Sequence, residues 1–303
     1  MPLAPSNGAR IYYEETGPKD GLCVPVVFVH EFAGDYRTWD DQMRHFGRGW
    51  RCVTMSARGY PKSDVPADEA LYGQSFFTSD IVAVMDAAGL DQAHVVGLSM
   101  GAYAALMVAI EHPDRVLSVV AAGGGSGSPK ASRATFQAEA RATAAHFEAN
   151  GTINADGMGH GPTRIQLKNK DPVGWQRFVD GLAEHDALAA AKTLRQVQAL
   201  RPSLYELEAE LKAIACPVLL MVGDEDEPCL DVNLWMKRLM SVSDLVLLPG
   251  SGHAINLEEP LLFNLLVEQF LAKVDGGRWR RRDPTAVPGS LTLLSAAAAK
   301  PQS

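Results

Sequence analysis

Cysteine is scarce in this chain of 303 residues, and long apolar runs are missing from it. The four cysteines are Cys23, Cys52, Cys216 and Cys229. They are too few and too scattered for a disulfide scaffold, and no CxxC motif is present. The longest apolar runs, such as residues 24–29 and 217–222, fall far short of the roughly 18 residues that a membrane-spanning helix needs. The sequence therefore argues against a disulfide-rich protein and against a membrane protein.

Positive charge is also in short supply. Lysine and arginine number 28 against 36 aspartates and glutamates, so the formal net charge is −8. A chain with an overall acidic field is a poor candidate for binding nucleic acid. The first residues contain no basic segment followed by an apolar one, so no signal peptide is expected. These absences predict a reduced, cytoplasmic, soluble protein that binds neither nucleic acid nor membrane.

Hydrophobic residues, by contrast, make up 47% of the chain, which is ample for a buried core. Short apolar runs alternate with longer helical patterns. We expect strands at 24–30, 51–57, 94–98, 115–122, 217–222 and 244–248, and helices at 76–89, 100–112 and 260–274. Valine and leucine without polar alternation are typical of strands buried on both faces of a parallel sheet. The alternation of strands and helices predicts an α/β fold.

One long segment breaks this alternation. It contains no convincing strand, and we expect helices in it near 132–148, 173–185, 187–200 and 203–213. A glycine-rich run at 123–129 precedes it and is a plausible hinge. We therefore expect a core made of residues 1–127 and 214–277, a helical cap at 128–213 and a loosely attached, partly basic tail at 278–303.

The strongest chemical signal is the pentapeptide Gly97-Leu98-Ser99-Met100-Gly101. It follows an expected strand and opens an expected helix, which is the context of a nucleophile elbow. The simpler interpretation is a serine that only caps a helix, which is common. The flanking elements and the partners described next favour Ser99 as a nucleophile.

A serine hydroxyl is a weak nucleophile, so it needs a base and an acid that orients the base. His253 lies in a glycine-rich loop after the last expected strand, whereas the other seven histidines lie in less suitable places. Four carboxylates compete on the loop after the preceding strand, and their spacing alone does not separate them: Asp224, Glu225, Asp226 and Glu227. The oxyanion would need two backbone N–H groups. We expect one from Met100 and one from the loop at 30–34, with Phe32 as the donor.

These segments together resemble the α/β-hydrolase superfamily, in its cap-bearing branch of esterases, lactonases and C–C bond hydrolases. The resemblance covers about residues 8 to 275. The loop at 30–34 is similar to the family's His-Gly-x-x-Gly, and residues 58–63 are similar to its Arg-Gly-x-Gly-x-Ser. Gly223-x-x-Asp226 matches the family's acid loop, which selects Asp226, and Gly252-His253 matches its histidine loop.

Two positions depart from the family pattern. Glu31 replaces the glycine of the oxyanion loop, and Pro61 replaces a glycine in the Arg-Gly segment. The first departure matters more, because a carboxylate there either turns away from the pocket or lies near its mouth. The second should have only local consequences.

The resemblance implies the α/β-hydrolase fold, a mostly parallel central sheet with helices on both faces and an inserted helical cap. It also implies a serine hydrolase that cleaves a carboxylic ester of a small or medium acyl group through an acyl-enzyme, without cofactor or metal. Two alternatives remain open. One is hydrolysis of a C–C bond or an enol lactone, and the other is a non-catalytic small-molecule binding protein.

The cap should supply apolar residues to the roof of the pocket. We expect Trp175, Phe178 and Phe136 among them. The alternative for Trp175 is that it only packs one cap helix against another. The sequence does not indicate an oligomeric state.

Overall fold

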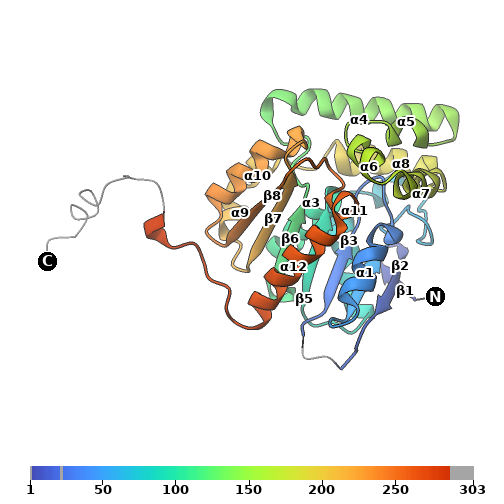
Figure 1. Cartoon of the computed structure of the whole chain (residues 1–303). Coiled ribbons are helices and arrows are strands. Elements are labelled where there is room, and N and C mark those ends of the chain that lie inside the picture. The colour runs from blue at the N-terminus through green and yellow to red at the C-terminus, as the bar shows by residue number, and fades with distance from the viewer. Residues whose placement is uncertain (1, 21–22, 287–303) are drawn as a thin grey trace, which may run out of the picture.

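A computed structural model describes residues 2–20 and 23–286 (Figure 1). Within these residues, eight strands form one sheet in the order β1-β2-β4-β3-β5-β6-β7-β8. The strands are β1 (Leu3–Ser6), β2 (Ala9–Thr16), β3 (Val26–Val29), β4 (Cys52–Met55), β5 (Ala93–Leu98), β6 (Val116–Ala122), β7 (Val218–Gly223) and β8 (Ser243–Leu248). The pairs β1–β2 and β2–β4 are antiparallel, and all other pairs are parallel.

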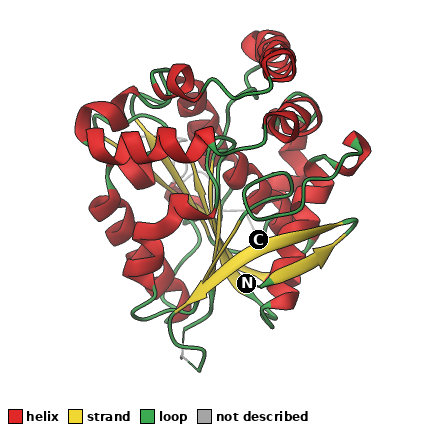
Figure 2. Cartoon of the chain, turned by 90° about the vertical axis from the view of Figure 1, so that its right-hand side faces the viewer, coloured by secondary structure: helices red, strands yellow, loops and turns green. Residues whose placement is uncertain are grey.

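Helices cover both faces of the sheet (Figure 2). The covering helices are α1 (Asp40–Phe46), α2 (Gln74–Ala87), α3 (Met100–Glu111), α10 (Glu227–Leu239) and α12 (Pro260–Asp275). Side chains of α2, α3 and α10 join one apolar cluster with one face of the strands, and side chains of α1 and α12 join a second cluster with the opposite face. Because β5 and β7 are covered on both sides, all of their residues are buried. The expected α/β fold with a mostly parallel sheet is confirmed.

The six strands expected from apolar runs are all in the sheet, whereas β1 and β2 were not anticipated. Both lie at the antiparallel edge, where a strand is not covered on both faces. The sequence of β2 is therefore mixed, with Glu14 and Glu15 following Tyr12 and Tyr13. The helices α1 and α10 were also missed: α1 has only two apolar residues, Met43 and Phe46, and α10 mixes seven apolar residues with four charged ones.

Between β6 and β7 the chain is helical. The α-helices of this segment are α4 (Lys130–Asn150), α5 (Ala155–Gly159), α6 (Ile165–Lys170), α7 (Pro172–Ala183), α8 (Ala187–Thr193) and α9 (Glu208–Ala213). The helix expected at 187–200 becomes π-helical at Leu194–Gln198, and the one expected at 203–213 begins with a 3₁₀ turn at Leu204–Leu207. Helices α4 to α8 lie together beyond one end of the sheet (Figure 1). They carry apolar clusters of their own, one between α4 and α8 and one among α5, α6 and α7.

The chain after α12 is described as far as residue 286. There Trp279 packs against both apolar clusters of the core, and its Nε1 donates a hydrogen bond of 3.2 Å to Asp244. The rest of the expected tail, residues 287–303, lies outside the described residues. Across the described part of the chain, none of the helices combines the length and the apolar character needed to cross a bilayer.

Candidate active site

Ser99 lies on a sharp turn between β5 and α3. Its backbone has φ 55° and ψ −110°, a region that non-glycine residues adopt only when their surroundings hold them there. Its N–H donates to the carbonyl oxygen of Ala122 on β6 over 2.7 Å. The neighbours have to be small. A Cβ on Gly97 would lie 2.1 Å from the carbonyl oxygen of Gly101, and one on Gly101 would lie 2.1 Å from that of Val29. The strained turn leaves Ser99 partly exposed at the carboxyl edge of the sheet.

Asp226 and His253 lie at the same edge, after β7 and β8 respectively. His253 Nδ1 is 2.7 Å from Asp226 Oδ2, and both side chains are almost fully buried. Because a carboxylate only accepts hydrogen bonds, Nδ1 carries the proton and Nε2 remains free to act as a base. Burial alone would lower the pKa of His253, but the charge of Asp226 and its hydrogen bond outweigh burial and hold that pKa well above its ordinary value.

The burial of the acid loop separates the four carboxylates that compete in the sequence. Asp226 is buried, whereas the other three are exposed: Asp224, Glu225 and Glu227. The end of β6 connects the serine and histidine loops. Ala122 accepts from the N–H of Ser99, and a Cβ on the adjacent Gly123 would lie 3.4 Å from His253 Nδ1. No hydrogen bond joins Ser99 to His253 within residues 2–20 and 23–286, and such catalytic contacts often tighten only when substrate binds.

A carboxylate that we did not single out from the sequence holds the histidine loop. Glu258 accepts hydrogen bonds from the N–H of Gly252 over 2.6 Å and from the N–H of Ala254 over 3.0 Å. These bonds fix the backbone on either side of His253. Burial raises the pKa of Glu258. The only signal for it in the sequence was its place in the Asn-Leu-Glu-Glu-Pro run after the histidine.

The loop after β3 is held by hydrogen bonds to its carbonyl groups. Ala57 N–H donates to His30 Nε2 over 2.9 Å, so the proton of His30 is on Nδ1, which lies 2.6 Å from the carbonyl oxygen of Glu31. Burial lowers the pKa of His30 to about 4, so the ring is neutral. Tyr60 donates to the carbonyl oxygen of Phe32 over 2.9 Å. Since the peptide unit is planar and trans, pinning the Glu31 carbonyl also sets the direction of the Phe32 N–H.

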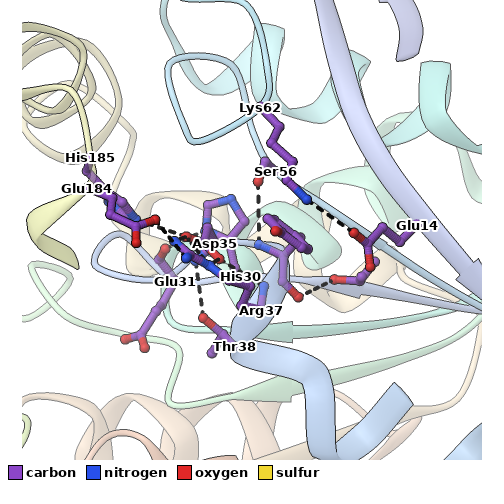
Figure 3. Close-up of polar contacts among 12 residues, drawn as sticks. Glu14, His30, Glu31, Asp35, Arg37, Thr38, Ser56, Lys62, Glu184 and His185 are labelled. Carbon is purple, nitrogen blue, oxygen red and sulfur yellow. Dashed lines mark hydrogen bonds and ion pairs between the residues drawn. The ribbon is translucent and has the colours of Figure 1, made fainter. Parts of the chain in front are cut away.

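Glu31 itself points toward the helical segment. Its carboxylate is buried and pairs with the guanidinium of Arg164, just before α6. In Figure 3 it extends away from a separate group of contacts that join Asp35 and Arg37 to Glu184 and His185. There Arg37 Nη1 is 2.7 Å from Glu184, and His185 Nε2 is 3.3 Å from Asp35. The departure from the family's glycine thus coincides with a contact to the cap.

The three aromatic residues expected in the pocket occupy different surroundings. Trp175 is buried among residues of α5 to α7, and its Nε1 donates to the carbonyl oxygen of Gly159 over 2.6 Å. Phe178 is half-buried and lines a cleft of about 380 Å³ between α7 and the loop that follows Phe32. Phe136 lies against Gly127 at the start of the helical segment. Ser99 does not line the cleft.

Asp226, Cys229 and His253 form a group whose possible ligand atoms all lie within 4.8 Å of one another. Aspartate, cysteine and histidine are all zinc ligands. However, the Nδ1 of His253 is engaged with Asp226, and burial raises the pKa of the Cys229 thiol, whereas a metal requires the thiolate. The arrangement therefore favours the Asp226–His253 hydrogen bond over a bound metal ion.

Comparison with known proteins places this geometry in a family. The family model for the alpha/beta hydrolase fold matches residues 24–260. A putative 2-succinyl-6-hydroxy-2,4-cyclohexadiene-1-carboxylate synthase from Bacillus subtilis (strain 168) is 24% identical over 282 residues, covering 89% of this chain and 97% of its own length.

Two solved structures share the fold over nearly their whole length. The enol-lactonase from Burkholderia xenovorans LB400 superposes with a TM-score of 0.77 and 21% identity, covering 89% of this chain and 100% of its own. A thermophilic esterase from Thermogutta terrifontis superposes with a TM-score of 0.77 and 21% identity, covering 90% and 98%. Since the family model spans most of the chain and the fold agrees with it, this protein belongs to the α/β-hydrolase fold family.

Proposed function

We propose that this chain is a serine hydrolase that cleaves carboxylic esters of small or medium acyl groups through an acyl-enzyme. The observation that carries the proposal is the buried hydrogen bond between His253 and Asp226, formed at the sheet edge where Ser99 occupies its strained turn. In this proposal residues 1–127 and 214–277 form the catalytic core. Residues 128–213 form a cap over the pocket, and residues 278–303 follow the core as a C-terminal tail.

In the first half of the reaction, His253 Nε2 removes the proton of Ser99 Oγ as that oxygen attacks the ester carbonyl carbon. The carbonyl oxygen becomes an oxyanion, which the N–H groups of Phe32 and Met100 stabilise. The C–O bond to the alcohol then breaks, and the imidazolium of His253 gives its proton to the departing oxygen. Asp226 remains ionised throughout and stabilises the positive ring.

In the second half, water takes the place of the alcohol. His253 removes a proton from the water as its oxygen attacks the acyl carbon, and a second oxyanion forms in the same place. The bond to Ser99 Oγ then breaks, and the serine recovers its proton from His253. The products are one carboxylic acid and one alcohol, and the chemistry needs no electron acceptor or metal ion.

The similarity to an enol-lactonase structure favours a second candidate, the hydrolysis of a lactone. The steps would be the same, but the departing oxygen would stay tethered to the acyl group and diffuse away only after deacylation. Cleavage of a C–C bond is the further alternative within this family, and a meta-cleavage product hydrolase from Pseudomonas fluorescens IP01 also shares the fold.

The test is turnover of a series of nitrophenyl esters and of an enol lactone by the purified chain, with Ser99→Ala beside it. We expect Ser99→Ala to lose nearly all hydrolysis while its melting temperature stays close to that of the unmodified chain. The matched control is Ser79→Ala, which removes an exposed hydroxyl on α2 and should leave the rate unchanged.

Labelling by an organophosphonate gives the second readout. Mass spectrometry should find the label on Ser99. A label on another serine would overturn the mechanism. A chain that binds esters or lactones but turns none over would instead be the non-catalytic binding protein.

A further inference from the structure

One short helix of the segment between β6 and β7 contacts all three loops of the candidate site. Arg164, just before α6, pairs with Glu31 on the loop after β3. Gln166 donates to Glu225 on the loop that carries Asp226. Lys170 Nζ lies 3.2 Å from Ser251 Oγ on the loop that carries His253. These contacts connect α6 to the loops of the proposed oxyanion donor, the acid and the base.

The contact between Arg164 and Glu31 is the most deeply buried of these. The side chains are 4% and 1% exposed, respectively. Arg164 Nη1 donates to the carbonyl oxygen of Thr163 over 2.6 Å, and the guanidinium lies 4.7 Å from the ring centre of Phe178. Glu31 Oε1 and Arg164 Nε have no hydrogen-bond partner within the described chain. A single contact, from Arg164 Nη2 to Glu31 Oε2, therefore joins the two side chains.

Stability does not account for such a pair. Removing two charges from water costs more than a single hydrogen bond between them recovers, so buried ion pairs are poor stabilisers. Each unpaired buried polar atom adds a further cost. What the pair does supply is a defined position for both partners, because neither charge can leave the other without being stranded in an apolar environment.

The position that it defines belongs to the loop of the proposed oxyanion donor. From the core, His30 holds the carbonyl of Glu31 and Tyr60 holds the carbonyl of Phe32. Arg164 contacts the same loop from the helical segment, because it pairs with the side chain of Glu31, the residue directly before Phe32. Two contacts thus converge on Glu31, one from His30 to its carbonyl oxygen and one from Arg164 to its carboxylate.

We propose that Arg164 is a positioning residue, which acts through Glu31 to complete the oxyanion hole when α6 is docked on the three loops. This inference rests on the proposed function, in which the Phe32 N–H receives the oxyanion. It assigns a purpose to the carboxylate that replaces the family's glycine. Docking of the cap and assembly of the hole become one event, so ester bond cleavage is favoured only in the closed state.

The test compares Arg164→Met with Arg195→Met. Arg195 also joins the segment between β6 and β7 to the core, through a 2.8 Å ion pair with Glu69, but it contacts none of the three loops. Active sites are counted with an organophosphonate. For Arg164→Met we expect kcat per site to fall about 10- to 100-fold, less than the roughly 10²–10³ of a lost oxyanion donor. KM should change little, and the inhibition constant of a trifluoromethyl ketone should rise in parallel with the loss in kcat.

Hydrogen exchange provides a readout that needs no activity. Amides at residues 30–36 should exchange faster in Arg164→Met and at the original rate in Arg195→Met. The double variant Glu31→Gln with Arg164→Met leaves no stranded charge, so it remains informative if the single variant folds poorly. We expect its kcat per site to be no lower than that of the less active of the two single variants, Glu31→Gln and Arg164→Met. Both substitutions remove the same contact, so their effects should not add.

Each outcome decides the matter. A kcat per site and an exchange rate in Arg164→Met that match Arg195→Met would overturn the positioning role, as would a change in KM alone. The positioning role would also be overturned if the fold-losses in kcat per site of Glu31→Gln and Arg164→Met multiplied in the double variant, because the two residues would then act independently. If the unmodified chain hydrolyses nothing, the proposed function fails, and the exchange rates of residues 30–36 still accept or reject the role of Arg164.

Discussion

Two buried histidines at the carboxyl edge of the sheet have pKa values that move in opposite directions. His253 faces the carboxylate of Asp226, whose charge and hydrogen bond outweigh burial and raise its pKa well above the ordinary value. His30 is bonded to a carbonyl oxygen and an amide N–H, and burial lowers its pKa to about 4. The same ring is therefore suited to accept a proton in one place and to stay neutral in the other. The partner, rather than the burial they share, decides the difference.

The first prediction concerns the acid. Asp226→Asn should lower kcat by roughly three to four orders of magnitude, because an amide no longer orients the imidazole or stabilises its charge. The acid limb of the pH profile of kcat/KM should also move to lower pH, since losing the carboxylate lowers the pKa of His253. Steady-state kinetics between pH 5 and 9 measure both effects.

The control for that measurement is Asp224→Asn. Asp224 is exposed, and its carboxylate accepts a 3.1 Å hydrogen bond from the N–H of Ser251 but has no contact with His253, so its loss should cost far less. If the larger loss followed Asp224→Asn instead, the assignment of the acid would move to Asp224.

The second prediction concerns His30. His30→Gln should lower kcat with little change in KM, because the flexible amide of glutamine does not hold the Glu31 carbonyl and the Ala57 N–H in the fixed geometry of the ring's Nδ1 donor and Nε2 acceptor. The loss should be at most the roughly 10²–10³ of one oxyanion donor. His94→Gln is the matched control, since His94 is equally buried and bonds Ser118 and Asp275 away from Ser99. Equal kcat losses in the two variants would show a general effect of removing a buried histidine.

At the scale of elements, the helices of the segment between β6 and β7 differ in what they contact. Helix α7 carries Trp175 toward α5, where its indole bonds Gly159, and Phe178 toward the cleft. Side chains one turn apart on the same helix thus belong to different surroundings. The position of Trp175 supports a packing role, whereas Phe178 lines a cleft that does not include Ser99, so its place in the substrate pocket stays a prediction.

The third prediction separates these roles. Trp175→Ala should lower the melting temperature, since emptying a buried aromatic site typically costs about 3–5 kcal/mol. It should leave unchanged the ratio of kcat/KM for a short and a bulky ester. Phe178→Ala should shift that ratio toward the bulky ester, with a smaller loss of stability. A shift in this kcat/KM ratio for Trp175→Ala would instead show that Trp175 lines the substrate pocket.

At the scale of the whole molecule, ion pairs join the helical segment to the sheet-bearing part. Hydrogen bonds from His185 and Arg37 hold the pKa of Asp35 well below its usual range, although burial opposes them. Arg195 donates hydrogen bonds to Glu69, and they are the main cause that lowers the pKa of Glu69 to about 2. Both carboxylates belong to the core, and His185 and Arg195 lie in the segment between β6 and β7 (Figure 3 for Asp35).

The fourth prediction follows from these depressed pKa values. A carboxylate whose pKa is lower in the folded state contributes stability above its unfolded pKa of about 4 and loses it as the pH falls toward the folded value. The melting temperature should therefore fall between pH 5 and pH 2. The Asp35→Asn variant should have a lower melting temperature than the unmodified chain at pH 7, and its melting temperature should fall less between pH 5 and pH 2. A pH dependence identical to that of the unmodified chain would remove Asp35 from this account.

Much of the fold was readable from local sequence, for a physical reason. Strands β3 to β7 are almost entirely buried, and burial imposes the short apolar runs by which they were recognised. The antiparallel strands β1 and β2 contain exposed positions, so their mixed residues did not reveal them. The elbow around Ser99 was readable too, because small residues on both sides of a serine are a local requirement of the turn.

Other features depended on residues that are distant in the chain. The acid loop offers four adjacent carboxylates, and only the family resemblance selected Asp226 among them. In the structure, Asp226 alone is both buried and bonded to His253. The roles of Glu258 and Arg164 have no local signature, since each depends on a partner that the fold brings near. The sequence by itself determined six of the eight strands, the longer apolar helices and the serine turn, because these are set by neighbours along the chain. Only the tertiary structure decided which charges are buried together, because burial and pairing depend on the packing of the whole chain.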